Sequence, residues 1–164
     1  MHYITHYPTH IQEQVTKMIS EKTLGKYLLK KYPHKHSLST DKALYEYAMN
    51  VKNEYLKKYR LDKVLYDGKV SDVNKALGTH TFISRVQGEK LKSKNVIKIA
   101  TFFKHVPEEF LHMIIVHELA HFKQKEHNKA FYQFCGYMMQ GYHQIEFDTR
   151  LYLLHVEMLG KLYN

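Results

Sequence analysis

Apolar residues recur at helical spacing through the first 55 residues of the chain. Between residues 9 and 32 most of them fall three or four positions apart, which predicts one helix. Thr9 and Gln12 match a capping box at its start, and Pro33 follows its end. A second stripe predicts another helix that starts near Thr40. Its apolar members are Leu44, Ala48, Val51 and Tyr55.

The pattern changes after about residue 62, where β-branched and aromatic residues become frequent between glycines. The segments "TFISRVQ" (81–87) and "VIKIATF" (96–102) are the best strand candidates, and "KVLYDGKV" (63–70) is a third. We therefore expect two or three short strands. Either of the first two segments is a candidate edge strand, to which an extended peptide could add.

Three helices are expected in the last 60 residues of the chain. A proline followed by two glutamates at 107–109 is typical of a helix start, because the acids lie at the positive end of the helix dipole. This helix is expected to run to about residue 123. Further helices are predicted at about 128–140 and 144–160.

Length and composition are those of an ordinary globular domain, with 164 residues, 44% of them hydrophobic and 25% charged. We expect a single domain over residues 1–164, in which residues 1–60 form a helical extension before a core of residues 61–164. The single cysteine fits a reducing compartment. We find no signal-peptide pattern and no apolar run long enough for a membrane span. A cytoplasmic protein without a membrane partner is expected, and the oligomeric state is left open.

Basic side chains outnumber acidic ones, and the formal net charge at pH 7 is +9. The excess is uneven, since residues 1–60 carry 11 basic and 5 acidic side chains, whereas residues 105–164 carry 5 and 7. Such an excess attracts nucleic acid and other anions. The lysines are scattered along the predicted helices without an arginine cluster, so a solvated surface is the favoured interpretation. Nucleic acid is kept as an alternative partner.

The stretch "VHELAHFKQKEH" (116–127) carries the candidate chemistry. His117 and His121 are four residues apart in a predicted helix, so their imidazoles project from one face and can reach one metal ion. Glu118 lies about 100° further round the helix, where it suits a general base that acts on a water molecule of the ion. The helix is apolar nearly all round, and burying these groups without a metal would be costly. We therefore predict a metal centre.

A catalytic metal site needs three protein ligands and one open position. His127 is the candidate third ligand, because it follows the second histidine by six residues after the helix is expected to end. Gln124 stands where a related zinc-protease motif has glycine, so the helix must end by other means, with Asn128 capping the next helix. The alternative third ligand is a carboxylate of the last helix, Glu146 or Asp148.

The segment "VHELAHFKQKEHNKAFYQF" resembles the YgjP-like (DUF45) metallopeptidase family, a zincin relative that is also similar to SprT-like proteases. The resemblance covers roughly residues 65–155 and leaves the first 60 residues unmatched. It implies a zincin-like α+β fold in which a small β-sheet packs on the metal-bearing HExxH helix. It also implies one Zn²⁺ per chain, with His117, His121 and His127 as ligands and Glu118 as the catalytic base.

The leading hypothesis is a zinc metallopeptidase that acts on a peptide or protein. Glu118 would take a proton from the attacking water and pass it to the leaving amine. A second electrophile should stabilise the oxyanion, and its candidates are His143, Tyr142 and Arg150. The same ligands would also serve a metal-dependent hydrolase of a non-peptide substrate such as a nucleotide phosphate. A third hypothesis is a DNA-associated SprT-like protease or binding module.

Overall fold

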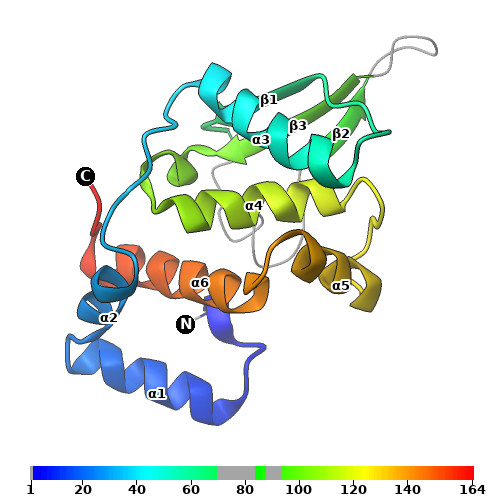
Figure 1. The fold of residues 1–164 in the computed structure, drawn as a ribbon. Helices are drawn as coiled ribbons and strands as arrows, with labels where there is room; N and C mark the ends of the chain where they lie inside the picture. The colour runs from blue at the N-terminus through cyan, green and yellow to red at the C-terminus, as the bar shows by residue number, and fades with distance from the viewer. Residues whose placement is uncertain (1, 70–83, 88–93) are drawn as a thin grey trace.

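The computed structural model describes residues 2–69, 84–87 and 94–164, and it combines helices with one small sheet (Figure 1). The α-helices are α1 (Thr9–Ser20), α2 (Leu24–Lys31), α3 (Asp41–Tyr55), α4 (Glu108–Ala120), α5 (Lys129–Met138) and α6 (Tyr142–Leu159). The strands are β1 (Lys63–Asp67), β2 (Ser84–Gln87) and β3 (Lys94–Ala100). Two 3₁₀ helices, η1 (His2–Ile4) and η3 (Thr101–His105), complete the described elements. The predicted α+β class is confirmed.

The three strands lie in the order β1-β3-β2, with β1 parallel and β2 antiparallel to β3. Ile97 in the middle of β3 pairs with Val64 on one side and Ser84 on the other. The expectation that segment 96–102 lies at an edge is therefore wrong, because β3 is the central strand. The last two residues of segment 96–102 belong to η3 and not to the strand. The first three residues of segment 81–87 lie outside the described residues.

Helix α4 lies at the centre of the fold, between the sheet and α6 (Figure 1). Its sequence is apolar nearly all round, and a helix of that kind is buried by other elements on most sides. Most of its residues are buried: Phe110, Leu111, Met113, Ile114, Ile115, Val116, His117, Glu118, Leu119 and Ala120. Within the described ranges, no helix is both long enough and apolar enough to cross a membrane.

The predicted single helix at 9–32 is divided into α1 and α2. The chain turns at Lys22, a non-glycine residue with a positive φ of 59°. The apolar spacing continues across the turn, which is why the pattern alone does not reveal it. The expected capping box is also wrong. Pro8 is the N-cap residue of α1, and the Gln12 amide instead donates to the carbonyl of Tyr7 at 2.8 Å.

Helix α2 packs closely against α6. A Cβ atom added to Gly25 would lie only 2.9 Å from Nε2 of His155, so a larger residue here would force the His155 side chain to shift. The fully buried Asp148 of α6 accepts hydrogen bonds from the hydroxyls of Tyr27 and Tyr32. The N-terminal helices are therefore joined to the C-terminal helix by both packing and polar contacts.

Helix α3 lies beside the sheet, as Figure 1 shows. The Thr40 hydroxyl accepts from the backbone N–H of Ala43 and caps the helix, which confirms the predicted start. Asp41 then accepts from the backbone N–H of Tyr66 in β1 at 2.9 Å, and the Tyr66 hydroxyl donates to the carbonyl of Leu38. Contacts therefore cross the expected boundary near residue 60.

Candidate metal centre

The C-terminal end of α4 carries the first two histidines. His117 lies in the last turn of the helix, and His121 follows as the C-cap with helical dihedral angles of −66° and −14°. The next backbone N–H groups bond back three residues, so the helix tightens and ends. The predicted helix end near residue 123 was therefore about three residues too late.

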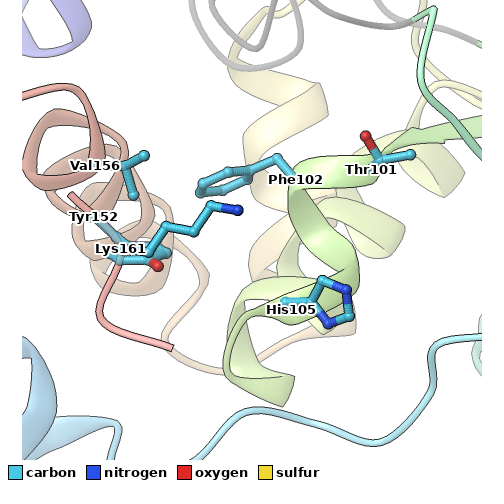
Figure 2. Close-up of a pocket in the computed structure, with 6 residues that line it drawn as sticks. All are labelled: Thr101, Phe102, His105, Tyr152, Val156 and Lys161. Atoms are coloured by element: carbon cyan, nitrogen blue, oxygen red, sulfur yellow. The ribbon is translucent and has the colours of Figure 1, made fainter. Parts of the chain in front are cut away.

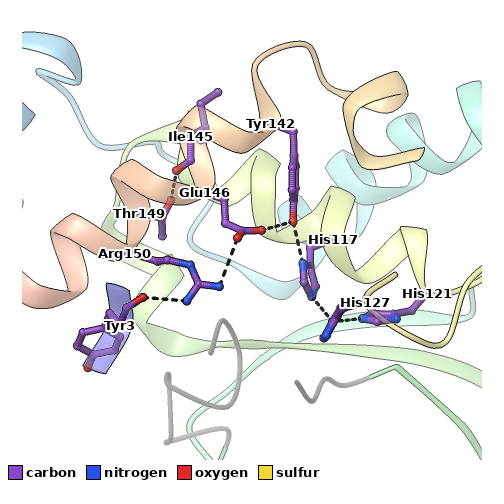
Figure 3. A network of polar contacts seen from close by, with 9 residues as sticks. All are labelled: Tyr3, His117, His121, His127, Tyr142, Ile145, Glu146, Thr149 and Arg150. Atoms are coloured by element: carbon purple, nitrogen blue, oxygen red, sulfur yellow. Dashed lines mark hydrogen bonds and ion pairs between the residues drawn. The ribbon is translucent and has the colours of Figure 1, made fainter. Parts of the chain in front are cut away.

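The turn after α4 does not require glycine. Lys22 is the one non-glycine residue with a positive φ in the described part of the chain, so Gln124 adopts an ordinary conformation. Its backbone carbonyl faces Nδ1 of His121 at 3.0 Å, and this contact closes the turn on the imidazole. The chain then returns to the helix end with His127 (Figure 3).

The three imidazoles converge through their Nε2 atoms. Nε2 of His127 lies 3.0 Å from Nε2 of His121 and 3.2 Å from Nε2 of His117 (Figure 3). His117 is buried, and the other two rings are partly accessible. Among the described residues, these three form a group whose ligand atoms lie within 4.8 Å of one another.

These distances fit a shared metal ion. Two imidazole nitrogens at the usual 2.0–2.1 Å from a tetrahedral ion are separated by about 3.3–3.4 Å. The observed separations of 3.0 and 3.2 Å are close to that value. Imidazole nitrogen suits zinc, copper, iron and nickel. The donor set therefore fits a divalent transition metal with a coordination position left for water or substrate.

The outer ring nitrogens have partners that fix the protonation of two rings. Tyr142 donates its hydroxyl proton to Glu146 at 2.7 Å, so its oxygen accepts from Nδ1 of His117 at 2.8 Å. Nδ1 of His121 donates to the carbonyl of Gln124. A neutral imidazole that donates through Nδ1 has its lone pair on Nε2. Both rings therefore direct lone pairs at the shared centre, as metal ligation requires.

Phe131 packs against all three imidazoles. Its ring centroid lies 4.9 Å from that of His117, 4.6 Å from that of His121 and 4.9 Å from that of His127. Asn128 accepts from the backbone N–H of Phe131 at 2.8 Å and caps α5, as the sequence predicted. The start of α5 thus supplies an apolar wall that holds the three rings together.

Glu118 is 1% exposed and follows His117 on α4. Burial raises the pKa of its carboxyl group well above the usual value, because desolvation disfavours the charged form. A cation at the histidine cluster would favour the charged form and so oppose this effect. A buried carboxyl group with a strongly raised pKa is a typical component of a catalytic site.

Sequence comparisons agree with this arrangement. The family described as "YgjP-like, metallopeptidase domain" matches residues 12–148. The chain belongs to the YgjP-like family. A relative named UTP pyrophosphatase, from Escherichia coli (strain K12), is 51% identical over 157 residues, which cover 95% of this chain and 94% of the relative. No solved structure gives a significant match.

The YgjP-like match begins at residue 12, much earlier than the expected 65, so the family includes most of the predicted N-terminal extension. This range agrees with the contacts that join α2 and α3 to the rest of the fold. The three clustered histidines lie well inside it. Family membership and the histidine cluster both support a metal-dependent hydrolase.

The other predicted site residues of this YgjP-like chain lie behind or beside the cluster. Tyr142 contacts Nδ1 of His117, on the side of the ring away from Nε2, and Glu146 binds Tyr142 (Figure 3). Arg150 is buried and pairs with Glu146 at 3.3 Å. His143 is exposed, with its ring 5.7 Å from that of Tyr132. The structure thus brings Glu146 next to a partner of His117 and not into the group of Nε2 atoms.

A separate pocket lies between η3 and the C-terminal part of α6 (Figure 2). Its lining consists of Thr101, Phe102, His105, Tyr152, Val156 and Lys161. None of the three clustered histidines lines it. The pocket is therefore not part of the candidate metal centre.

Proposed function

We propose that this chain is a metal-dependent hydrolase that cleaves the α–β phosphoanhydride bond of a nucleoside triphosphate, with UTP as its substrate. The products would be UMP and pyrophosphate. The convergence of three Nε2 atoms carries the proposal, because it provides a site for a divalent ion, and the buried Glu118 that follows His117 on α4 is the candidate proton acceptor. The relative named UTP pyrophosphatase, which is 51% identical over nearly the whole chain, supports this substrate.

We propose zinc as the resident ion, since three neutral imidazoles with one open position are a frequent zinc donor set. Such an ion supplies a Lewis acid for a phosphoryl oxygen and lowers the pKa of a bound water molecule. His117 and His121 would hold it from the end of α4, and His127 from the turn that follows. The Nδ1 contacts of the first two rings fix the tautomers that this role needs.

Glu118 would act as the general base. It would take a proton from the attacking water as the α–β bond breaks, and pyrophosphate would leave with the bonding electrons of the bridging oxygen. Burial raises the pKa of its carboxyl group, and a cation at the histidine cluster would oppose this effect and favour the charged form that accepts a proton. The residue is the glutamate of the HExxH motif, which has the same role in the predicted peptidase chemistry.

Exposed lysines close to the third histidine would bind the polyphosphate. Lys125 and Lys129 lie two residues before and after His127, and both are exposed. Lys123 is also exposed, and its ammonium group lies 4.7 Å from the centre of the Phe134 ring. Lysine binds phosphate as a compact point charge. The net charge of +9 would further favour approach of an anionic substrate.

Peptide hydrolysis is a second candidate function, because the matching family is described as a metallopeptidase domain. The same ligands and base would attack a peptide carbonyl, and a zincin-like arrangement of sheet and HExxH helix is part of this proposal. Strand β2 is at one edge of the sheet as described, so an extended peptide could pair with it. The two candidates differ in the bond that breaks.

The test measures metal content and products on the same preparation of the full-length chain. Elemental analysis should find about one transition-metal ion per chain. Incubation with UTP should give UMP and pyrophosphate in equal amounts on anion-exchange chromatography. Other nucleoside triphosphates and a panel of peptides are assayed in parallel. Release of orthophosphate from UTP, or peptide cleavage without UTP turnover, would contradict the nucleotide proposal.

A further inference from the structure

We propose that Tyr142, Glu146 and Arg150 are positioning residues that set the affinity of the histidine cluster for its ion by fixing the tautomer of His117. The inference rests on the metal-binding part of the proposed function. It concerns residues that do not touch the ion themselves. Metal ligation by histidine depends on the group that holds the other ring nitrogen, and loss of such a partner typically lowers metal affinity 10–100-fold.

His117 of α4 and the side chains of Tyr142, Glu146 and Arg150 on α6 form a continuous series of polar contacts (Figure 3). Nδ1 of His117 lies 2.8 Å from the Tyr142 hydroxyl oxygen, which lies 2.7 Å from Oε2 of Glu146. Oε1 of the same carboxylate accepts from Nη2 of Arg150 at 3.3 Å. Nη1 of Arg150 donates to the backbone carbonyl of Tyr3 in η1 at 3.2 Å.

The direction of each hydrogen bond follows from the charged end of the chain. Arg150 has only donors, so Oε1 of Glu146 accepts from it, and Oε2 of the same carboxylate accepts from the Tyr142 hydroxyl. Tyr142 must then donate to Glu146 and accept from His117. The proton of His117 is therefore on Nδ1, and its lone pair is on Nε2 toward the cluster.

Burial fixes the direction of these hydrogen bonds. The four residues are exposed by 3% (His117), 1% (Tyr142), 6% (Glu146) and 4% (Arg150). In such an environment an alternative proton arrangement would leave buried polar groups unsatisfied, which costs about 1–3 kcal/mol per group. Solvent cannot easily replace a lost partner. The carboxylate charge is balanced by the guanidinium next to it.

The chain also connects the metal centre to the N-terminal 3₁₀ helix. Tyr3 and Arg150 both lie outside the matched family range of 12–148. The hydrogen bond from Arg150 to Tyr3 therefore joins α6 to the N-terminal 3₁₀ helix.

Two substitutions interrupt this series of hydrogen bonds at different points. Tyr142→Phe removes the partner of Nδ1. In Glu146→Gln, the amide oxygen pairs with Arg150 and the NH₂ group faces Tyr142, which must then donate to Nδ1 of His117. The ring proton moves to Nε2 and blocks the lone pair. The matched control is Tyr152→Phe, which removes another buried tyrosine hydroxyl on α6, one that accepts from the backbone N–H of Leu162.

The first measurement is the dissociation constant for Zn²⁺ on the full-length chain, obtained by competition with a chromophoric chelator. We expect Tyr142→Phe and Glu146→Gln each to weaken Zn²⁺ binding about 10–100-fold, with Tyr152→Phe within about twofold of wild type. Thermal unfolding of the metal-free proteins gives the structural effect separately. Wild-type Zn²⁺ affinity in both Tyr142→Phe and Glu146→Gln, or an equal loss of affinity in Tyr152→Phe, overturns the inference.

The second measurement assigns the tautomers of His117 by long-range ¹H–¹⁵N NMR on the metal-free chain. We expect the Nδ1–H form in wild type and the Nε2–H form in Glu146→Gln. An Nε2–H tautomer in wild type overturns the inference. This measurement remains decisive even if wild type binds no metal ion, an outcome that would instead reject the proposed metal-dependent function.

Discussion

Nε2 of His121 lies 3.0 Å from Nε2 of His127, although the end of α4 and a complete turn separate the two residues in the chain. The helix alone positions only the first pair of histidines. The third reaches the cluster because the turn closes on the carbonyl of Gln124 and because Asn128 starts α5 immediately afterwards. The candidate metal centre is thus formed by the end of one helix and the start of the next.

His127→Ala should therefore weaken metal binding without unfolding the chain. Two nitrogen ligands remain, and the partly accessible His127 ring loses only its contacts with the neighbouring rings, among them Phe131. We expect the site to bind metal at least about tenfold more weakly, since loss of a ligand costs no less than loss of a ligand's partner, so the metal content after dialysis should fall well below one ion per chain. The control is His34→Ala, which removes an exposed loop histidine. Full metal content in His127→Ala would contradict the three-histidine site.

Glu118→Gln should abolish hydrolysis while the metal remains bound. Glutamine keeps the shape of the side chain but cannot accept the proton of the attacking water. We expect UTP turnover to fall by at least about 10²-fold, the usual contribution of a general base. Metal content should stay at the wild-type level, because Glu118 is not among the grouped ligand atoms. Retained turnover would exclude this residue as the base.

Phe131→Ala should lower both stability and metal affinity. The ring is fully buried and touches all three imidazoles, so its removal leaves a cavity beside them. A Phe→Ala change in a core typically costs about 3–5 kcal/mol of unfolding free energy. Phe134→Ala, one turn later and only half-buried, should cost clearly less. Urea denaturation of the metal-free proteins, combined with Zn²⁺ titration, measures the two effects separately.

The pair at positions 117 and 121 was predictable because it depends only on helical periodicity and on an apolar sequence around it. The contact between Tyr142 and His117 was not, since it depends on how α5 and α6 are joined. That joint requires a positive φ of 81° at Gly141, and α6 begins directly after it, two residues before the predicted start. The sequence places Tyr142 near the site but does not reveal which atom it contacts.

The arrangement of the first helices could also not be predicted from the apolar pattern. Nothing in the apolar spacing distinguishes one helix at 9–32 from two helices that turn at Lys22. The division lets α2 lie against α6 with Gly25 at the contact. The charge pattern predicted no element of the fold, and nucleic-acid binding stays a prediction from the net charge. Helical periodicity therefore predicted the histidine pair, whereas the side chains that contact this pair depend on the tertiary structure.

Asp148→Asn should destabilise the whole chain by about 1–3 kcal/mol, the cost of leaving buried donors poorly paired. The Asp148 carboxylate accepts from Tyr27, Tyr32 and Lys31, and an amide would turn its own donors toward some of them. We also expect one unfolding transition for residues 1–164, because these contacts join the two ends of the chain. Urea denaturation followed by circular dichroism and by tyrosine fluorescence tests both points. Two separate transitions would contradict the single-domain prediction.

The stability of the chain should fall in mild acid because of His36. This ring accepts from the backbone N–H of Leu38 at 2.9 Å through Nδ1 and faces the carbonyl of Phe103 at 2.8 Å through Nε2. Only a neutral ring can make both hydrogen bonds. Burial is the main cause that lowers its pKa below 6.5, since desolvation disfavours the charged form.

The sign of the effect follows from proton uptake. The unfolded chain protonates His36 near pH 6.5, whereas the folded chain resists protonation until a lower pH. The stabilisation is therefore complete above pH 6.5 and decreases as the pH falls toward the folded pKa. The hydrogen bond with the Phe103 carbonyl and, to a smaller extent, nearby Glu108 oppose the shift, while His105 and Lys35 add to it. We expect the difference in unfolding free energy between wild type and His36→Gln to be smaller at pH 5.5 than at pH 7.5, and a constant difference would contradict this assignment.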